Sequence, residues 1–225
     1  DSLIKPSDYV IRSEEYGIPQ TRHRVILLGI RKDHCYKKIN LLKKQDKCPT
    51  AVDVLSDLPQ LRSYISQSEC TDDQWDKTIS RFKKEYLPVI KKEYQGEKKM
   101  LIELKKSMSV ITEKKLPSGC DLGMKQRKKM SKKLSDGLRK WYHDERMENY
   151  IVNHTARKHM QEDLYRYLFS AVYTKIHKYS PRLKQFPNKL LPIHKNVESG
   201  NFADRFRVQN SKKPATTITS HISKD

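Results

Sequence analysis

The first 60 residues follow the pattern of short strands joined by turns. Residues 8–12, DYVIR, predict a strand, and Gly17 and Pro19 mark the turn that follows it. The next segment, RVILLGIR at residues 24–31, is apolar without interruption from Val25 to Ile30. That pattern predicts a strand buried on both faces in the middle of an α/β sheet. Because the chain shows no second strand of this kind, we expect the neighbouring strands to lie outside it.

Four later segments have the periodicity of amphipathic helices. Apolar residues recur every three or four positions, which places them on one face of a helix. Pro88 and Gly96 are expected to interrupt the first helix, and the last is expected from about Met160 to Ile176. The residues expected to face the core are Trp75, Ile79, Phe82 and Tyr86; Leu101, Leu104 and Met108; Met130, Leu134 and Leu138; and Leu164, Leu168 and Val172.

Two further segments complete the predicted organisation. Thr50 and Asp53 have the spacing of a capping box, which predicts a short helix over residues 50–56, and Pro59 helps to end it. Residues 180–197 contain three prolines and predict a loop with at most one short helix. The chain is therefore expected to be rich in strands up to residue 60, helical and basic from about 70 to 178, and irregular afterwards.

Composition and charge narrow the class of protein. The 225 residues include 47 Lys and Arg against 27 Asp and Glu, a formal net charge of +20 at pH 7. Such an excess of positive charge favours a nucleic-acid partner. Only 36% of the residues are hydrophobic, and no apolar run approaches the ~18 residues of a membrane-spanning helix. We expect one modest core with a large polar part, and no membrane association.

Cysteine and histidine positions argue against a metal site. The four cysteines have neither the spacing of zinc ligands nor that of a disulfide framework. His154 and His159 are five residues apart and so do not share a helical face as ligands four apart do. Cys35 follows His34 directly, and adjacent side chains point apart, so we assign no catalytic thiol. Free thiols and the lack of a secretory signal indicate a cytoplasmic protein, and the absence of an initial Met suggests a cut chain.

The segment from Lys125 to Lys140 is the most basic in the chain. Eight of its sixteen residues are Lys or Arg, and it contains one acid. One interpretation is a solvated helix face. The charge of the whole chain favours the other interpretation, contacts with nucleic-acid phosphates. The candidate DNA-binding residues here are Arg127, Lys128, Lys129, Lys132 and Lys133.

A polar cluster precedes the apolar strand. Arg22 and Arg24 are two residues apart on an extended segment and project to the same side, with the amide of Gln20 two residues before them. Polar groups beside a buried strand are costly unless an anionic or carbonyl-rich partner receives them. A structural ion-pair cluster is the alternative.

A second polar cluster lies near the C-terminus, in residues 202–220. Its Thr and Ile residues alternate as in a strand, and hydroxyl groups together with arginines suit a phosphate and sugar backbone. An ordinary surface strand is the alternative. The candidate DNA-binding residues of this segment are Arg205, Arg207, Thr216, Thr217 and Thr219.

Together these clusters resemble the DNA (cytosine-5) methyltransferase family. YGIPQTRHRVILLGIR, residues 16–31, is similar to the family's eighth conserved block, in which Gln-x-Arg-x-Arg precedes a strand. RFRVQNSKKPATTITSHISKD, residues 205–225, resembles the ninth block, here with Arg207, Pro214 and Thr217. Between these blocks the family carries its target recognition domain, and residues 153–169 and 180–197 look like segments of one bacterial subgroup.

The resemblance implies an α/β fold class and three regions. Residues 1–60 correspond to the C-terminal part of a Rossmann-like methyltransferase sheet, 61–200 to a mainly helical, basic target recognition domain, and 201–225 to the ninth-block strand. It also implies S-adenosyl-L-methionine as cofactor, double-stranded DNA as substrate, and a role in restriction-modification or phage defence. No cofactor-binding residue is assigned in this chain.

The family extrudes a cytosine from duplex DNA, attacks its C6 with a Cys thiolate and methylates its C5. By matching positions, Arg24 is expected to hydrogen-bond the extruded base, Arg22 to support the nucleophile loop, and Gln20 to brace the turn. These three are the candidate catalytic residues. Arg207, Thr216 and Thr217 are expected to organise the recognition domain against the sheet and the DNA.

Several family motifs are absent from these 225 residues. There is no Pro-Cys nucleophile motif, since Cys48 precedes Pro49, and no cofactor-binding Gly-rich turn. We therefore expect an inactive C-terminal fragment whose partner is the N-terminal catalytic half of the same protein. The alternative is a non-catalytic, helical nucleic-acid-binding protein in which both blocks are chance matches.

Overall fold

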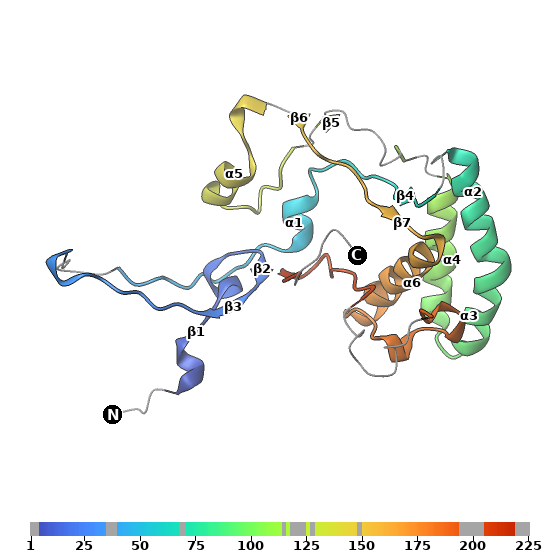
Figure 1. Cartoon of the computed structure of the whole chain (residues 1–225), viewed down its shortest axis with the longest axis horizontal. Helices are drawn as coiled ribbons and strands as arrows, with labels where there is room; N and C mark the ends of the chain where they lie inside the picture. The colour runs from blue at the N-terminus through green and yellow to red at the C-terminus, as the bar shows by residue number, and fades with distance from the viewer. Residues whose placement is uncertain are drawn as a thin grey trace. The chain divides into compact units, whose positions relative to one another are not determined.

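The computed structural model describes residues 5–34, 40–67, 71–113, 116–117, 125–126, 129–147, 150–193 and 205–218. The chain forms two compact units (Figure 1). Unit 1 comprises Asp1–Asp57, Lys129–Tyr142 and Ser211–Asp225, and unit 2 comprises Leu58–Lys128 and His143–Asn210. Each unit is thus assembled from segments that are distant in sequence.

The described part of unit 1 consists of short helices, 3₁₀ turns and four short strands, three of which come from the start of the chain. Strand β1 pairs with β3 in antiparallel fashion, with Ile11 opposite Arg24, and β2 pairs with β8 in parallel. The strands are β1 (Val10–Arg12), β2 (Gln20–Thr21), β3 (His23–Val25) and β8 (Ala215–Thr216). The helices are α1 (Ala51–Leu55), α5 (Asp136–Tyr142) and the 3₁₀ turns Pro6–Tyr9, Ser13–Tyr16 and Lys32–His34.

The predicted buried strand at residues 25–30 is wrong for the chain by itself. Only Val25 belongs to a strand, β3, and Ile26, Leu27 and Leu28 are 63%, 92% and 72% exposed. The physical reason is the lack of paired neighbours in the described residues: β1 has three residues and no second strand flanks β3. An apolar strand is buried only where other strands and helices cover both of its faces.

Unit 2 is mainly helical. A continuous helical run is formed by α2 (Asp72–Arg81), a π-helical turn (Phe82–Tyr86) and α3 (Leu87–Glu93), followed by α4 (Lys98–Glu113) and α6 (Gln161–His177). Two strand pairs flank the helices, β4 (Tyr64–Ile65) with β7 (Lys158–His159) and β5 (Lys125–Gln126) with β6 (Tyr150–Ile151). The remaining elements are the 3₁₀ turns Glu145–Met147, Leu183–Gln185 and Asn188–Leu190.

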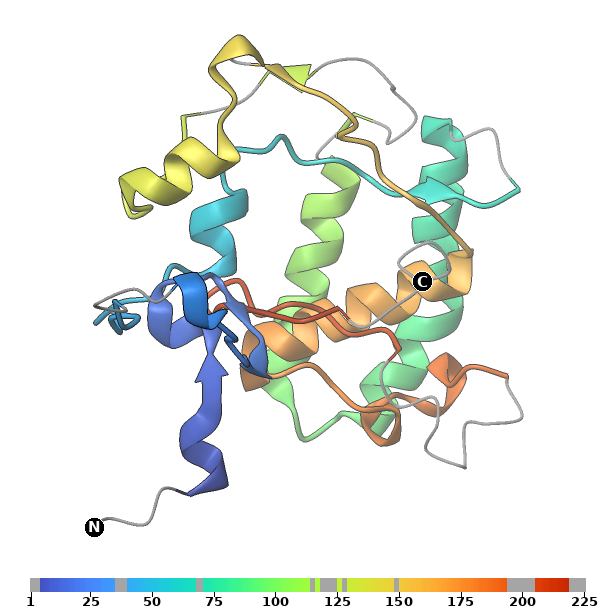
Figure 2. The ribbon, with the colours of Figure 1, turned by 60° about the vertical axis from the view of Figure 1, so that its left-hand side comes forward.

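The core of unit 2 forms where α6 crosses α4 (Figure 2). Its fully buried side chains include Phe82 from the π-helical turn, Leu104 from α4 and Phe169 from α6. Aromatic rings meet there with centroids 5–6 Å apart, as in the pair Phe82 and Tyr165 at 5.2 Å. None of the described helices has the length and apolar character that crossing a membrane requires.

Three predicted helices of unit 2 are confirmed, with two local differences. Pro88 does not interrupt the first helix, because the π-helical turn before it ends at Tyr86 and leaves Pro88 in the first turn of α3. Gly96 does separate α3 from α4. In α6 Val172 is buried as predicted, whereas Leu164 and Leu168 are half-buried. The residues that follow them, Tyr165 and Phe169, are buried instead.

Two other segments differ from the prediction: one has a shorter helix, and the other has more regular structure. The helix expected around Met130, Leu134 and Leu138 begins only at Asp136, where Ser135 caps it, although Leu134 and Leu138 are buried as predicted. In the described part of residues 180–197 there are two short 3₁₀ turns rather than one. Leu183 and Leu190 pack into the core from these turns.

Candidate functional site

The two polar clusters of the sequence meet in unit 1. Gln20 lies opposite Ala215 and Thr21 opposite Thr216 in the parallel pair of β2 and β8. The N–H of Ala215 donates to the carbonyl of Pro19 at 3.0 Å, and the hydroxyl of Thr217 donates to the carbonyl of Thr21 at 2.9 Å. Segments almost 200 residues apart in sequence are therefore held together at one place.

The turn before β2 is built on Gly17 and Ser13. Gly17 has a φ of +80°, a conformation that side-chain-bearing residues rarely adopt. The Ser13 hydroxyl donates to the carbonyl of Gln20 and accepts from the N–H of Arg22 at 3.0 Å. The backbone N–H of Ser13 also donates to the carbonyl of Arg22, at 3.2 Å. These bonds fix the backbone from Gln20 to Arg22.

The two carboxylates of the 3₁₀ turn Ser13–Tyr16 have partners other than Arg22 and Arg24. Glu14 lies 2.7 Å from the Nε2 of His23, and Glu15 pairs with both Arg12 and Lys44. Burial acts to raise the pKa of Glu14, but the hydrogen bond and charge of His23 outweigh it, so that pKa lies below its ordinary value. Glu14 is therefore an anion that faces His23.

Arg22 and Arg24 are exposed and have no carboxylate partner among the described residues. The Nη1 of Arg24 donates to the carbonyl of His23 at 2.7 Å, a bond that leaves its other donors available. The guanidinium of Arg22 makes no hydrogen bond within the described ranges. The structural ion-pair cluster considered from the sequence is thus not formed by these two arginines.

Gln20 contributes through its backbone rather than its side chain. Its carbonyl accepts from Ser13, and its residue position defines the register with β8. Within the described part of the chain its half-buried side-chain amide makes no hydrogen bond. Ser13, which sequence reasoning missed, performs the bracing of the turn.

The ninth-block segment is also attached to helix α1. Carbonyl groups of Ser211 and Lys213 accept from the N–H groups of Val52 and Ala51, at 3.0 and 2.9 Å. Two of the N–H groups at the start of the helix, which have no partner inside the helix, are thereby satisfied. The segment before β8 is consequently fixed on one side by α1, and β8 itself by β2.

The predicted capping box at the start of α1 is confirmed. The carboxylate of Asp53 accepts from the hydroxyl of Thr50 at 2.6 Å and from its backbone N–H at 3.0 Å. These two bonds, aided by the charge of Lys133 at 3.5 Å, lower the pKa of Asp53 below its ordinary value. Lys133 thus attaches the basic segment to α1, a contact between positions that the sequence does not relate.

The candidate DNA-binding residues are distributed over both units. Lys129, Lys132, Lys133, Thr216 and Thr217 belong to unit 1, together with Gln20, Arg22 and Arg24, whereas Arg205 and Arg207 belong to unit 2. Arg127, Lys128 and Thr219 lie outside the described residues. The structure therefore gathers the lysines and threonines, but not Arg205 and Arg207, into the unit that holds the catalytic candidates.

Neither a thiol nucleophile nor a metal site is found in the described ranges. The thiol of Cys48 donates to the carbonyl of Ile18 at 3.1 Å, and burial raises its pKa, both of which oppose thiolate formation. Among these residues no group of three or more His, Cys, Asp or Glu side chains is placed to hold a metal ion.

The residues present do not fit S-adenosyl-L-methionine. The glycines are too scattered for a phosphate- or cofactor-type turn, since no two of the seven are separated by a single residue. The described strands have three residues or fewer and occur in pairs, not in a parallel sheet with an open crevice at its edge.

Comparison with known proteins supplies the classification. The Type II methyltransferase M.BbvI of Brevibacillus brevis is 40% identical over 53 residues, which are 23% of this chain and 14% of that relative. The chain thus matches only a small part of the length of this curated relative. No solved structure matches this chain. The family model for the C-5 cytosine-specific DNA methylase matches residues 7–220. Since that match spans nearly all 225 residues, this chain belongs to the C-5 cytosine-specific DNA methylase family.

Proposed function

We propose that this chain supplies the eighth block, the target recognition region and the ninth block of a cytosine-5 DNA methyltransferase that uses S-adenosyl-L-methionine. The regions are residues 1–60, 61–200 and 201–225, as the resemblance implies. The observation that carries the proposal is the pairing of Gln20 and Thr21 with Ala215 and Thr216, beside two arginines that have no carboxylate partner in the described part of the chain. A chance match of either block gives no reason for the two to pair.

Arg24 is proposed to act on the extruded cytosine. Attack of a thiolate at C6 moves negative charge towards O2 of the ring, where a fixed cationic donor stabilises the transition state more than the ground state. Arg24 meets this requirement because it is exposed and opposes Ile11 in the paired strands β1 and β3. Arg22, on backbone fixed by Ser13, is proposed to support the loop that carries the nucleophile.

The N-terminal catalytic half of the same protein is the proposed partner of unit 1. The exposed aliphatic residues Ile26, Leu27 and Leu28 support this, because neighbouring strands and helices would remove them from water. Each such side chain contributes about 1.5–3 kcal/mol when it is fully buried. The nucleophile and the cofactor site are proposed to lie in that half, so the 225-residue chain alone transfers no methyl group.

DNA binding by the purified chain tests the proposal. A fluorescein-labelled duplex of mixed sequence is titrated with the chain, and its anisotropy is measured at about 50 and about 200 mM salt. Replacing Lys129 and Lys132 by Ala is expected to lower the dependence of log K on log salt by about one for each lysine. The matched control replaces Lys91 and Lys92, exposed on α3 in unit 2.

The outcomes separate the proposal from its alternatives. Equal losses in both double variants would indicate binding by overall charge, as in a non-catalytic nucleic-acid-binding protein. Incorporation of methyl groups into DNA by the purified chain with S-adenosyl-L-methionine would contradict the proposed division of the enzyme. Reading the coding sequence upstream of Asp1 for a Pro-Cys motif is the quickest independent check.

A further inference from the structure

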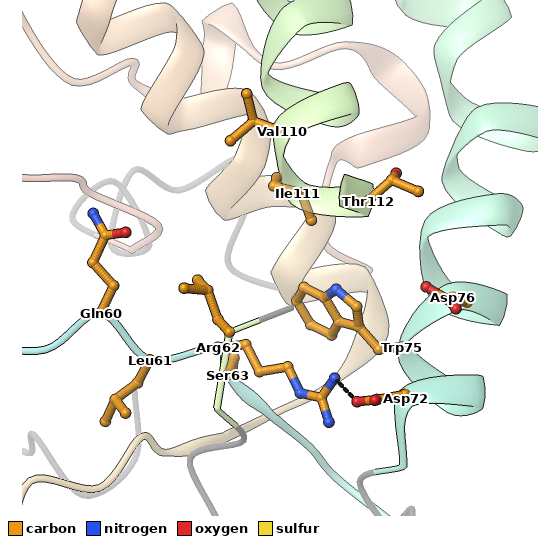
Figure 3. A pocket seen from close by; sticks show the side chains of 11 residues that line it. Gln60, Leu61, Arg62, Ser63, Asp72, Trp75, Asp76, Val110, Ile111 and Thr112 are labelled. Atoms are coloured by element: carbon orange, nitrogen blue, oxygen red, sulfur yellow. Dashed lines mark hydrogen bonds and ion pairs between the residues drawn. The ribbon is translucent and has the colours of Figure 1, made fainter. Parts of the chain in front are cut away.

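The two tryptophans of the chain have opposite electrostatic surroundings. Trp75 on α2 is half-buried and lines a cavity of about 380 Å³ together with the carboxylates of Asp72 and Asp76 (Figure 3). The guanidinium of Arg62 lies 6.0 Å from the Trp75 ring centroid and pairs with Asp72. Carboxylates beside this indole repel phosphate, so the Trp75 cavity is unsuited to DNA.

Trp141 is instead an exposed indole on the basic segment of unit 1. It lies in the last turn of α5 and is 71% exposed, the largest side chain so exposed among the described residues. Lys129, Lys132 and Lys140 share its segment and make no ion pair within the described ranges. Lysines without an ion pair in the described ranges, on the segment that also carries an exposed aromatic ring, offer groups that suit both parts of a nucleic acid, its phosphates and its base faces.

Local contacts fix the backbone that carries this indole, and its ring stacks on that of Tyr142 with centroids 5.6 Å apart. Leu134 and Leu138 are buried, and the N–H of Leu138 donates to the hydroxyl of Ser135 at 3.3 Å. The guanidinium of Arg139 donates to the carbonyls of Leu134 and Lys132, at 3.0 and 2.8 Å, and so ties the preceding loop to α5. A side chain on such a support loses little conformational freedom when it binds.

The same segment and the eighth-block turn line one cavity. A cavity of about 600 Å³ is lined by Leu138 and Lys133 of the basic segment and by Gly17 and Thr50 of the first 57 residues. Lys133 also pairs with Asp53 of α1. Trp141 therefore belongs to the same packed unit as Arg22 and Arg24.

We propose that Trp141 stacks on a nucleobase of the DNA that unit 1 binds. The proposal rests on the proposed function, since duplex bases expose their faces only where the stack is opened, as it is next to an extruded nucleotide. The indole supplies the stacking face, while Lys129, Lys132 and Lys140 neutralise neighbouring phosphates. Trp141 is thereby a positioning residue for the duplex and takes no part in the chemistry.

Single-tryptophan variants provide the test. Trp75→Phe leaves Trp141 as the chain's one indole, and Trp141→Phe leaves Trp75. Emission of each variant is recorded during titration with an unlabelled duplex that carries one unpaired cytosine, where the base stack is already open, and, separately, with dextran sulfate, a polyanion without bases. We expect the duplex to quench and to shield from acrylamide the emission of the Trp75→Phe variant, and dextran sulfate to do neither. Emission of the Trp141→Phe variant should not change with either polyanion.

Affinity gives a second readout. Trp141→Ala is expected to weaken duplex binding by roughly 5- to 150-fold, the range observed for loss of one stacked base. Because Trp141 is exposed, the thermal unfolding of the Trp141→Ala variant should match that of the unmodified chain. Duplex binding with unchanged Trp141 emission and an unaffected Trp141→Ala variant would overturn this inference and leave the proposed function standing. Failure of the chain to bind duplex DNA at low salt would overturn both.

Discussion

At the scale of single residues, the carboxylates around the eighth-block turn pair with basic side chains other than Arg22 and Arg24. Glu14 faces His23, Glu15 faces Arg12 and Lys44, and Arg22 and Arg24 keep donors available. An arginine without a partner on the surface costs little free energy, because water solvates it. Such an arginine can donate to a bound partner without first breaking a bond inside the protein.

Asp53 offers a test of the local structure that supports the site. Its pKa is lowered in the folded state, so its contribution to stability is present above its unfolded pKa and is lost as the pH falls through the folded value. We expect the free energy of unfolding to fall for this reason as the pH is lowered through, and then below, the ordinary range of an aspartate carboxyl group. Asp53→Asn should reduce stability by about 1–2 kcal/mol at neutral pH and remove this part of the acid dependence.

Thermal unfolding followed by circular dichroism across that pH range measures the effect. Thr50→Val removes the hydroxyl that donates to Asp53 and should weaken the acid dependence, whereas Thr50→Ser keeps it. An acid dependence identical in the unmodified chain and in Asp53→Asn would show that the capping box is not its source.

Sequence pattern predicted this capping box because both partners lie within four residues of each other. The role of Ser13 and the pairing of Asp53 with Lys133 were not predictable in the same way. Ser13 bonds across a turn to residues seven and nine positions on, and Lys133 is 80 positions from Asp53. Such contacts depend on tertiary structure, which local spacing does not encode.

At the scale of elements, the turn that joins the 3₁₀ turn Ser13–Tyr16 to β2 depends on Gly17. Its positive φ disfavours any side chain, and a Cβ atom there would collide with the side-chain amide of Gln45. Since this turn delivers Gln20 to its register with Ala215, a change at Gly17 acts on the strand pair as well.

Gly17→Ala should therefore lower the free energy of unfolding by about 1–2 kcal/mol. Gly29→Ala is the matched control, since Gly29 has ordinary φ and open space around its Cβ position, and should have little effect. Adding Gln45→Ala to Gly17→Ala should restore the part caused by the collision but not the part caused by φ. Chemical denaturation checks this, and equal stability of the two glycine variants would contradict the assigned role of the turn.

Helices were predictable to the extent that periodicity defines a face. The stripe of Ile79, Phe82 and Tyr86 is buried as its spacing indicates, and so are Leu104 and Met108. In α6 the larger rings of Tyr165 and Phe169 are buried in preference to Leu164 and Leu168, because helix packing selects the face that fills the space against α4. The two-residue strands β4 to β7 carry too short a pattern to be recognised.

The apolar run from Val25 to Ile30 illustrates the limit of the same reasoning. Its composition predicts burial, yet Leu27 is 92% exposed in this chain. Composition specifies that a segment favours burial, and only the presence of neighbouring strands decides whether it is buried. The same run thus supports the proposal that a further segment of the enzyme packs against it.

At the scale of the whole molecule, both units are discontinuous in sequence. Residues 129–142, in the middle of the predicted recognition domain, belong to unit 1 together with residues 1–57 and 211–225. Linear reasoning placed the region's boundaries at residues 61 and 200, and those boundaries remain a proposal. Family membership was predictable because Gln20, Arg22 and Arg24 and the segment after Arg207 form specific patterns, whereas the folding of the basic segment onto unit 1 required the structure.

Methyl transfer by the proposed complete enzyme, this chain together with the proposed N-terminal catalytic half, tests the central claim most directly. Incorporation of radiolabelled methyl groups from S-adenosyl-L-methionine into DNA is measured for the unmodified protein, Arg24→Ala and Arg31→Ala. Arg31 is the matched control because its guanidinium pairs with Asp33 on the same segment. We predict that Arg24→Ala lowers kcat by roughly 100- to 1,000-fold, as for loss of one oxyanion donor, while Arg31→Ala stays near the unmodified rate. Equal activity of the two variants would contradict the role assigned to Arg24.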